Sequence, residues 1–325
     1  MRLSPQRLLL GGLLLIAAAA GPAGGEDSAV GLAEARELLF GPLPDAAAEA
    51  ACLQRPVRDV RAETRIRIRC LIRKRYGRDA KAARLALKLY DRTGGIAGLL
   101  PAQQMDGGYR GRIELVPHLP LGKDRVHLAR LTGALVEMDD FFSAIERAAG
   151  GPVHYRWRDL RFRFYRSVGR RTPAAFASGW TIGYNVRGTL NYSTRAVRDL
   201  MFHEIFHLND QAAGDWSDEA LGEIHATITG RCGRRIKCLR PYVRGWLKVR
   251  RGTFYAFMPG HGPEEYAAEL ALNYLREQRA VQLGKKVRRP FKCGPALNAE
   301  AWQRITKAFF AGVDLVPDCP QKEPR

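Results

Sequence analysis

The clearest helical signal in the chain runs from Val126 to Ala149. Apolar residues recur there at intervals of three and four, which places them on one side of a helix and leaves charged residues on the other. The pattern predicts a long amphipathic helix that packs on a core. Its buried side should consist of Leu128, Leu131, Leu135, Met138, Phe142 and Ile145.

The chain before that helix is also predicted to be largely helical. The segment GLAEARELLF should form a helix that ends near Gly41-Pro42, and Asp79 to Tyr90 should form another. Between them, Val60 to Arg75 contains the alternation Ile66-Arg67-Ile68-Arg69, which a strand would also show. We favour a helix because the segment is rich in Ala, Glu and Arg and its neighbours are helical.

Shorter apolar segments on either side of the long helix predict antiparallel strands, joined by turns rich in Gly, Asn and Pro. They are Arg112 to Val116, Leu160 to Tyr165, Gly179 to Val186 and Thr189 to Ser193. The stretch from Gly94 to Gly108 is rich in Gly, which suggests a boundary. The sequence therefore predicts an α+β fold, with an N-terminal helical region at residues 26–105 and a second domain at residues 106–325.

The candidate chemistry lies in the segment from Thr194 to Asp210. Thr194 is a suitable N-cap, Asn209 can end the helix, and apolar residues form a stripe between them. The segment contains His203-Glu204-Ile205-Phe206-His207, the HExxH pattern. Side chains four positions apart share a helix face, so both imidazoles can bind one metal ion. Two His and one carboxylate suit Zn²⁺ with a position left for water, and Glu204 can accept a proton from that water.

A carboxylate ligand must come from another element, and two acidic segments compete for the role. In GPEEYAAELALNYL, Glu265 and Glu269 lie four residues apart, so one can bind the metal while the other holds a ligand in place. The alternative third ligand is Glu219 in GDWSDEALGEIHAT, which follows His207 closely. His225, in that same segment, is interpreted as structural.

The order of these residues resembles a group of gluzincin peptidases. HExxH followed by Asp210, with the segment Glu265-Tyr-Ala-Ala-Glu269 downstream, is similar to the Mlc titration factor A family and to the catalytic domain of anthrax lethal factor. The resemblance covers Thr189 to Leu272 and implies a zincin-like fold, in which a twisted antiparallel or mixed sheet lies over a backing helix and the metal helix. It implies that His203, His207 and Glu265 bind zinc and that Glu204 is the base. By the same resemblance, Asp210 is a supporting residue and Glu269 a carboxylate behind the ligands.

One departure from that pattern concerns the oxyanion. The relatives place a Tyr seven residues before the ligand Glu, to stabilise the tetrahedral oxyanion, and this chain has Met258 there. Tyr255 and His261 flank that position, and either could donate the hydrogen bond. We rank Tyr255 slightly first, although a core aromatic next to Phe254 and Phe257 is an equal alternative.

The N-terminus and the cysteines indicate export. Residues 1–25 have basic residues at positions 2 and 7, a short apolar run and then small residues, which is typical of a cleaved signal peptide. No later apolar run is long enough to predict a membrane span. Six cysteines follow, an even number that favours disulfides in an exported protein. Proximity suggests Cys52–Cys70, Cys232–Cys238 and Cys293–Cys319.

The net charge of +20 permits attraction to anionic partners, but a solvated basic surface explains it more simply. No nucleic-acid-binding motif is present among those we can test. The insert from Thr229 to Arg251 is strongly basic and falls between the two ligand segments, so it should overhang the cleft. It either favours acidic residues in the substrate or is an ordinary surface loop. Its basic residues are Arg231, Arg234, Arg235, Lys237, Arg240, Arg244, Lys248, Arg250 and Arg251.

The sequence thus predicts a periplasmic or secreted zinc metallopeptidase that acts on polypeptides, with acidic ones as a candidate class. Two alternatives remain open. One is a binding protein that keeps the fold without hydrolysis, which the intact Glu204 argues against. The other is an amidase of the cell envelope, which the basic charge permits but no wall-binding repeat supports.

Overall fold

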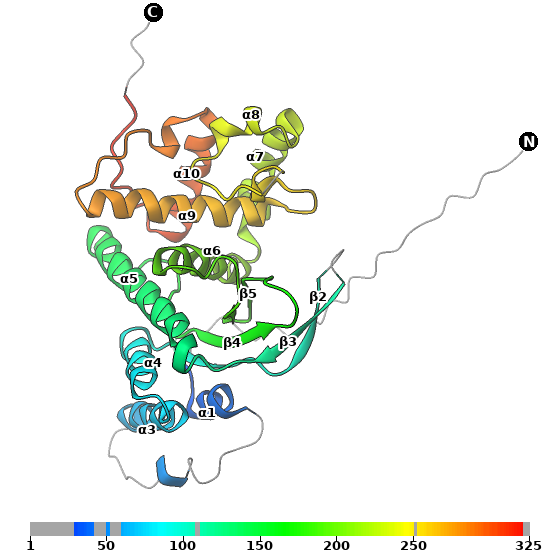
Figure 1. Ribbon diagram of the computed structural model, residues 1–325. Helices are drawn as coiled ribbons and strands as arrows, with labels where there is room; N and C mark the ends of the chain where they lie inside the picture. The colour runs from blue at the N-terminus through cyan, green and yellow to red at the C-terminus, as the bar shows by residue number, and fades with distance from the viewer. Residues whose placement is uncertain (1–28, 42–49, 53–59, 108–110, 250–251, 321–325) are drawn as a thin grey trace, which may run out of the picture.

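The computed structural model describes residues 29–41, 50–52, 60–107, 111–249 and 252–320, and shows an α+β arrangement with helices on both sides of a sheet (Figure 1). Three N-terminal helices lie on one side: α1 (Leu32–Phe40), α3 (Val60–Tyr76) and α4 (Ala80–Thr93). The prediction that residues 60–75 form a helix and not a strand is therefore confirmed. The expected signal peptide at residues 1–25 lies outside the described residues.

The six-stranded sheet has the order β2-β3-β4-β6-β5, and β1 also pairs with β4. Its strands are β1 (Ile96–Leu99), β2 (Gln103–Asp106), β3 (Arg112–Pro117), β4 (Arg161–Ser167), β5 (Ala175–Ser178) and β6 (Thr181–Asn185). The sequence suggested a boundary where β1 and β2 lie. Both strands instead belong to the sheet, and α1 and α4 pack on β1, so the N-terminal helices share a core with the later strands.

The expectation of antiparallel strands is wrong for two pairs, because β1 with β4 and β4 with β6 run parallel. Helix α5 (Arg125–Ala149), the predicted long helix, carries the chain back across the sheet before β4 begins. Such a crossover is what a parallel pair requires. After β4 the chain moves to the outer edge as β5, and the β5–β6 hairpin returns β6 to the place next to β4.

The segment Thr189 to Ser193 forms turns, so the prediction of a strand there is wrong. Asn191 is buried, and its side-chain amide donates to the carbonyl oxygens of Ala174 and Asn185 at 3.1 and 2.7 Å. These bonds tie the segment to the end of β6 instead of extending the sheet. Ser193, not Thr194, then caps the next helix by accepting a hydrogen bond from the backbone of Ala196.

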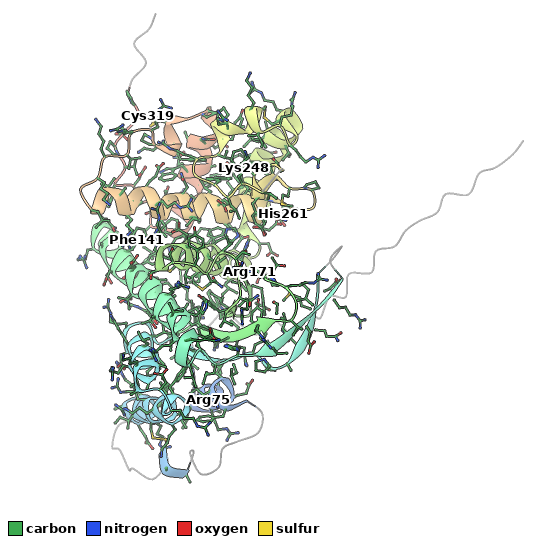
Figure 2. All side chains as sticks on the ribbon, in the orientation of Figure 1. Arg75, Phe141, Arg171, Lys248, His261 and Cys319 are labelled. Atoms are coloured by element: carbon green, nitrogen blue, oxygen red, sulfur yellow. A yellow bond between two sulfur atoms is a disulfide. The ribbon has the colours of Figure 1, made fainter. Side chains whose placement is uncertain are left out.

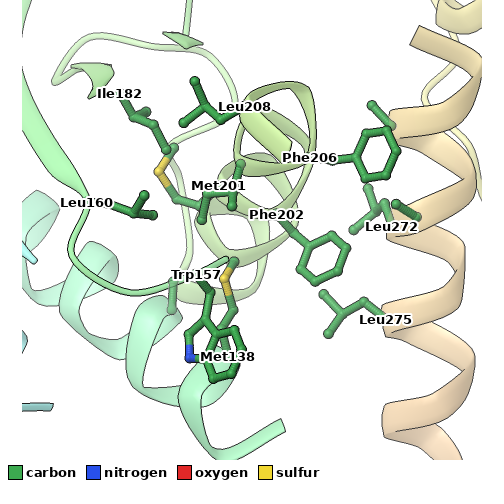
Figure 3. Packing of buried hydrophobic residues seen from close by; sticks show 14 of the residues in the cluster. Met138, Trp157, Leu160, Ile182, Met201, Phe202, Phe206, Leu208, Leu272 and Leu275 are labelled. Carbon is green, nitrogen blue, oxygen red and sulfur yellow. The ribbon is translucent and has the colours of Figure 1, made fainter. Parts of the chain in front are cut away.

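Helix α6 (Thr194–Ala212) carries the HExxH pattern and is buried on more than one face (Figure 3). Met201 lies next to Ile182 of β6 and Leu160 just before β4, while Phe202 and Phe206 point towards α9 (Pro263–Gln282). Asn209 does not end the helix as expected. Its buried side chain bonds both backbone groups of Arg156, which holds α6 against the chain that leads into β4.

The rest of the chain folds beyond α9 as α7 (Trp216–Cys232), α8 (Ile236–Leu239) and α10 (Ala296–Phe309). All three disulfides suggested by proximity are present: Cys52–Cys70, Cys232–Cys238 and Cys293–Cys319. Within the described residues, no helix has the length and apolar character that a bilayer span needs.

Candidate metal centre

Helix α6 places the two imidazoles of the HExxH pattern side by side. His203 and His207 are one turn apart, and their Nε2 atoms lie 3.2 Å from each other. The rings meet edge to face, with centroids 4.8 Å apart. His203 is buried, whereas His207 is partly open. The two nitrogens therefore converge on one point at the edge of the helix.

Helix α9 brings a carboxylate to that point from 62 residues along the chain. Glu265 lies in the first turn of α9, and its Oε2 is 3.0 Å from His203 Nε2 and 3.6 Å from His207 Nε2. Glu264 turns away and accepts a hydrogen bond from the backbone of Gly262 at the start of the helix. Adjacent helix positions diverge by about 100°, so only one of the two glutamates can reach the histidines.

The spacing of these three atoms fits a tetrahedral metal ion. Ligands placed tetrahedrally about 2.0–2.1 Å from an ion are about 3.3 Å apart. The three edges of the triangle formed by His203, His207 and Glu265 are 3.0, 3.2 and 3.6 Å. Among the described residues this is the group whose ligand atoms lie close enough to hold one ion. Two imidazoles with one carboxylate are also a donor set that zinc accepts.

An ion-pair network fixes α9 against α6. The guanidinium of Arg276 on α9 donates to Asp199 on α6 at 3.0 Å and to the carbonyl oxygen of Gly245 at 2.8 Å. Glu137 on α5 forms ion pairs with Arg198 and Arg279, one from each of these helices, at 3.3 and 3.1 Å. These contacts set the position of α9 along α6 and hence bring Glu265 opposite the histidines.

Glu269 stands behind the first histidine. Its Oε1 lies 3.8 Å from His203 Nδ1, the ring nitrogen that faces away from His207 and Glu265. The carboxylate is almost fully buried, and it accepts a hydrogen bond from the backbone N–H of Leu247 at 3.4 Å. A buried carboxylate in this place can orient the ring so that Nε2 remains directed at His207 and Glu265.

Tyr255 reaches the cluster, and His261 contacts Tyr255. The Tyr255 hydroxyl lies 3.2 Å from Glu265 Oε1, the carboxylate oxygen that does not approach the histidines. His261 Nδ1 donates to the backbone carbonyl oxygen of Tyr255 at 2.8 Å, and the two rings meet edge to face. His261 thus holds the turn that presents Tyr255, while the phenol itself faces the site.

Asp210 binds Ser217 and not the metal cluster. Its carboxylate accepts hydrogen bonds from the backbone N–H and the hydroxyl of Ser217, at 2.8 and 2.6 Å, at the start of α7. It therefore fixes the corner between α6 and α7. The structure does not bring Glu219 to the cluster, because it is exposed in the first turn of α7. His225 stacks on Phe257 and faces the carbonyl oxygen of Ala256, in keeping with a structural role.

The charges of the cluster favour a cation. Burial by itself would lower the pKa of His203, but the hydrogen bond and charge of Glu265, with Glu269 and Glu204 adding, raise it to about 9. Burial also raises the pKa of Glu204, against the attraction of the two histidines. Two imidazoles are thus surrounded by three carboxylates in a site that is partly buried from solvent. The carboxylates are those of Glu204, Glu265 and Glu269. A bound divalent ion would offset this negative charge.

Comparison with family models, with curated proteins and with solved structures finds no match to this chain. Sequence reasoning missed the contacts of Leu247, whose carbonyl oxygen accepts from the Tyr255 backbone while its N–H bonds Glu269. Backbone groups leave no mark in a sequence motif, so no signal could have revealed them.

Proposed function

We propose that this protein is a zinc metallopeptidase with a zincin-like fold that hydrolyses peptide bonds outside the cytoplasm. The observation that supports it most directly is the triangle of His203 Nε2, His207 Nε2 and Glu265 Oε2, with edges of 3.0–3.6 Å. The two histidines and the glutamate would hold the ion. When bound, zinc lowers the pKa of its water to about 7 and polarises a carbonyl group.

Glu204 has the position and environment of the general base. It follows His203 on α6, is partly buried, and forms no hydrogen bond with any of the described residues. Burial raises the pKa of its carboxyl group, which strengthens it as a proton acceptor. Glu204 would take the proton of the attacking water and then deliver it to the leaving amine. Because a binding protein needs no such base, Glu204 favours catalysis over binding alone.

Tyr255 is the better of the two oxyanion donors. Its hydroxyl lies 3.2 Å from the carboxylate of Glu265, whereas the Nδ1 of His261 is engaged by the carbonyl oxygen of Tyr255. A small rotation of the phenol away from Glu265 would let it donate to a developing oxyanion. His261 would then act as a positioning residue that holds the tyrosine turn.

The sheet edge next to the site suits the binding of an extended peptide, and the disulfides suit a location outside the cytoplasm. β5 forms the edge of the sheet and packs against α6, so its outer backbone groups can pair with a substrate strand. The three disulfides are expected of a protein that folds in an oxidising compartment. Together with the predicted signal peptide, they support a periplasmic or secreted location.

The test combines metal analysis with hydrolysis assays on the purified mature chain. Wild type should contain about one zinc per molecule and cut casein or an unfolded polypeptide. Glu204→Gln should keep the zinc and lose activity, while His207→Ala and Glu265→Ala should lose both. Release of peptide stems from peptidoglycan, without casein cleavage, would favour the envelope amidase. Equal zinc in wild type and Glu265→Ala, or full activity of Glu204→Gln, would refute the proposal.

A further inference from the structure

A basic cavity of about 590 Å³ opens in the part of the molecule that carries the basic insert. Arg234 and Arg235 line it from the turn between α7 and α8, and Thr253 lines it from the segment just after the insert. Met258 and Pro259 form another wall, from the loop that joins the Tyr255 turn to α9. The cavity is therefore bounded by the basic insert on one side and by the loop that holds Met258 and Pro259 on the other.

Backbone hydrogen bonds join these walls to the metal cluster. Leu247 accepts from the backbone N–H of Tyr255 at 2.8 Å and donates to the carboxylate of Glu269, and Val249 donates to the carbonyl oxygen of Thr253 at 2.9 Å. Met258 lies three residues after Tyr255, so their Cα atoms are less than about 12 Å apart. A peptide spans that distance in about four residues. One wall of the cavity is thus continuous with the turn that presents the Tyr255 hydroxyl to Glu265.

Arg234 and Arg235, which line the cavity, form no ion pair with the described carboxylates. No acidic residue occurs between Glu223 and Glu264 in the sequence. Within residues 229–249, none of the basic side chains forms an ion pair with a described carboxylate. Arginines elsewhere differ: Arg163, for example, pairs with Glu37 at 2.9 Å. The cavity therefore concentrates unpaired positive charge.

Parts of the wall are also fixed in place. Arg235 donates to the carbonyl oxygens of Arg231 and Cys232 at the end of α7, at 2.7 and 3.1 Å, and the disulfide Cys232–Cys238 closes the same turn. The buried hydroxyl of Thr253 has no hydrogen-bond partner in the described structure. A guanidinium held in this way loses less side-chain entropy when it binds an anion.

We propose that this cavity is a substrate subsite for a carboxylate, so that the enzyme prefers peptides with an acidic residue near the scissile bond. The proposal rests on the peptidase function proposed above. A diffuse basic surface would speed the encounter with any acidic peptide, in a way that salt screens. A built subsite instead acts at one substrate position and depends on particular arginines.

The experiment uses fluorogenic peptides that carry one Glu at successive positions around the cleavage site, each matched by a peptide with Gln at that position. Wild type is compared with Arg234→Gln, which removes an exposed arginine that forms no hydrogen bond with the described residues. Arg78→Gln is the control, because Arg78 is also exposed and belongs to the N-terminal helical region. Figure 2 shows Arg75, from that region, at the opposite end of the molecule from Lys248.

At one position, wild type should show a kcat/KM about tenfold or more higher for Glu than for Gln, since a hydrogen bond to a charged group contributes at that level. Arg234→Gln should reduce the ratio severalfold, and Arg78→Gln should leave it unchanged. Gln peptides with a free or an amidated C-terminus test whether the carboxylate is that of the chain end instead of a side chain. If wild type prefers the peptide with the free C-terminus and Arg234→Gln loses that preference, the subsite binds the C-terminal carboxylate of the substrate.

Equal rates for Glu and Gln peptides would overturn the subsite while leaving the peptidase proposal intact. So would a preference that Arg234→Gln does not change. If no peptide is cut, the peptidase proposal fails, and the affinity of labelled Glu and Gln peptides for the intact protein decides the subsite by itself. Equal affinities would then overturn it, and tighter binding of Glu that depends on Arg234 would support it.

Discussion

Replacing Asp210 by Ala should destabilise the fold without weakening metal binding. The buried carboxylate accepts two hydrogen bonds from Ser217, at 2.6 and 2.8 Å, at the first turn of α7. Hydrogen bonds to a charged group contribute about 1.5–3 kcal/mol each. The cost of burying Asp210, which raises its pKa, offsets part of this gain. We therefore expect the free energy of unfolding to fall by about 3 kcal/mol.

Thermal unfolding followed by circular dichroism measures this change. In a chain of this size, about 3 kcal/mol corresponds to a decrease in Tm of roughly 6–12 °C. Ser217→Ala is the matched control, because it removes the hydroxyl but keeps the backbone hydrogen bond, so its effect should be about half as large. Both decreases should be similar in metal-loaded protein and in protein treated with a chelator.

A different role for Asp210 would give a different result. If its carboxylate oriented His207, as a partner of a metal ligand does, zinc affinity would fall by about 10–100-fold. The loss of stability would then shrink once the metal was removed. Either that outcome in a competition assay with a zinc chelator or an unchanged Tm would refute the reasoning from the α6–α7 corner.

Three further changes test other parts of the site and its support. Glu269→Gln should weaken zinc binding about tenfold, because Glu269 faces His203 Nδ1 at 3.8 Å; an unchanged dissociation constant in chelator competition would contradict this. Tyr255→Phe should retain zinc and lower kcat about a hundredfold, and a normal kcat would rule out the phenol as the oxyanion donor. Burial raises the pKa of Glu277 to about 7, although its hydrogen bond with the backbone N–H of Phe291 opposes this. The folded protein therefore holds this proton more tightly than the unfolded chain does. The free energy of unfolding should fall by up to about 3 kcal/mol as pH rises from about 4.5 to about 7. Glu277→Gln should remove that slope in urea unfolding, and an equal slope in the variant would show that another group is responsible.

Much of the local structure could be read from the sequence because it depends on neighbours in the chain. The apolar repeat from Leu128 to Ile145 specified the long helix α5, and the four-residue spacing of His203 and His207 placed their rings on one face. The position of Glu265 relative to Glu264 followed from the same helical geometry. The disulfide pairs could also be predicted from the sequence, because each bridge closes a short loop.

Only the tertiary structure decided how distant elements meet. No local pattern distinguishes a parallel from an antiparallel neighbour, so the pairing of β1 and β4, which depends on the crossover through α5, could not be predicted. The choice between Glu265 and Glu219 depended on α9 lying against α6, which ion pairs such as Arg276–Asp199 hold across 77 residues. The sequence by itself determined which side chains share a helix face, because that is set by bonds a few residues apart. The packing of the helices determined which carboxylate reaches the histidines, because that contact depends on the whole core.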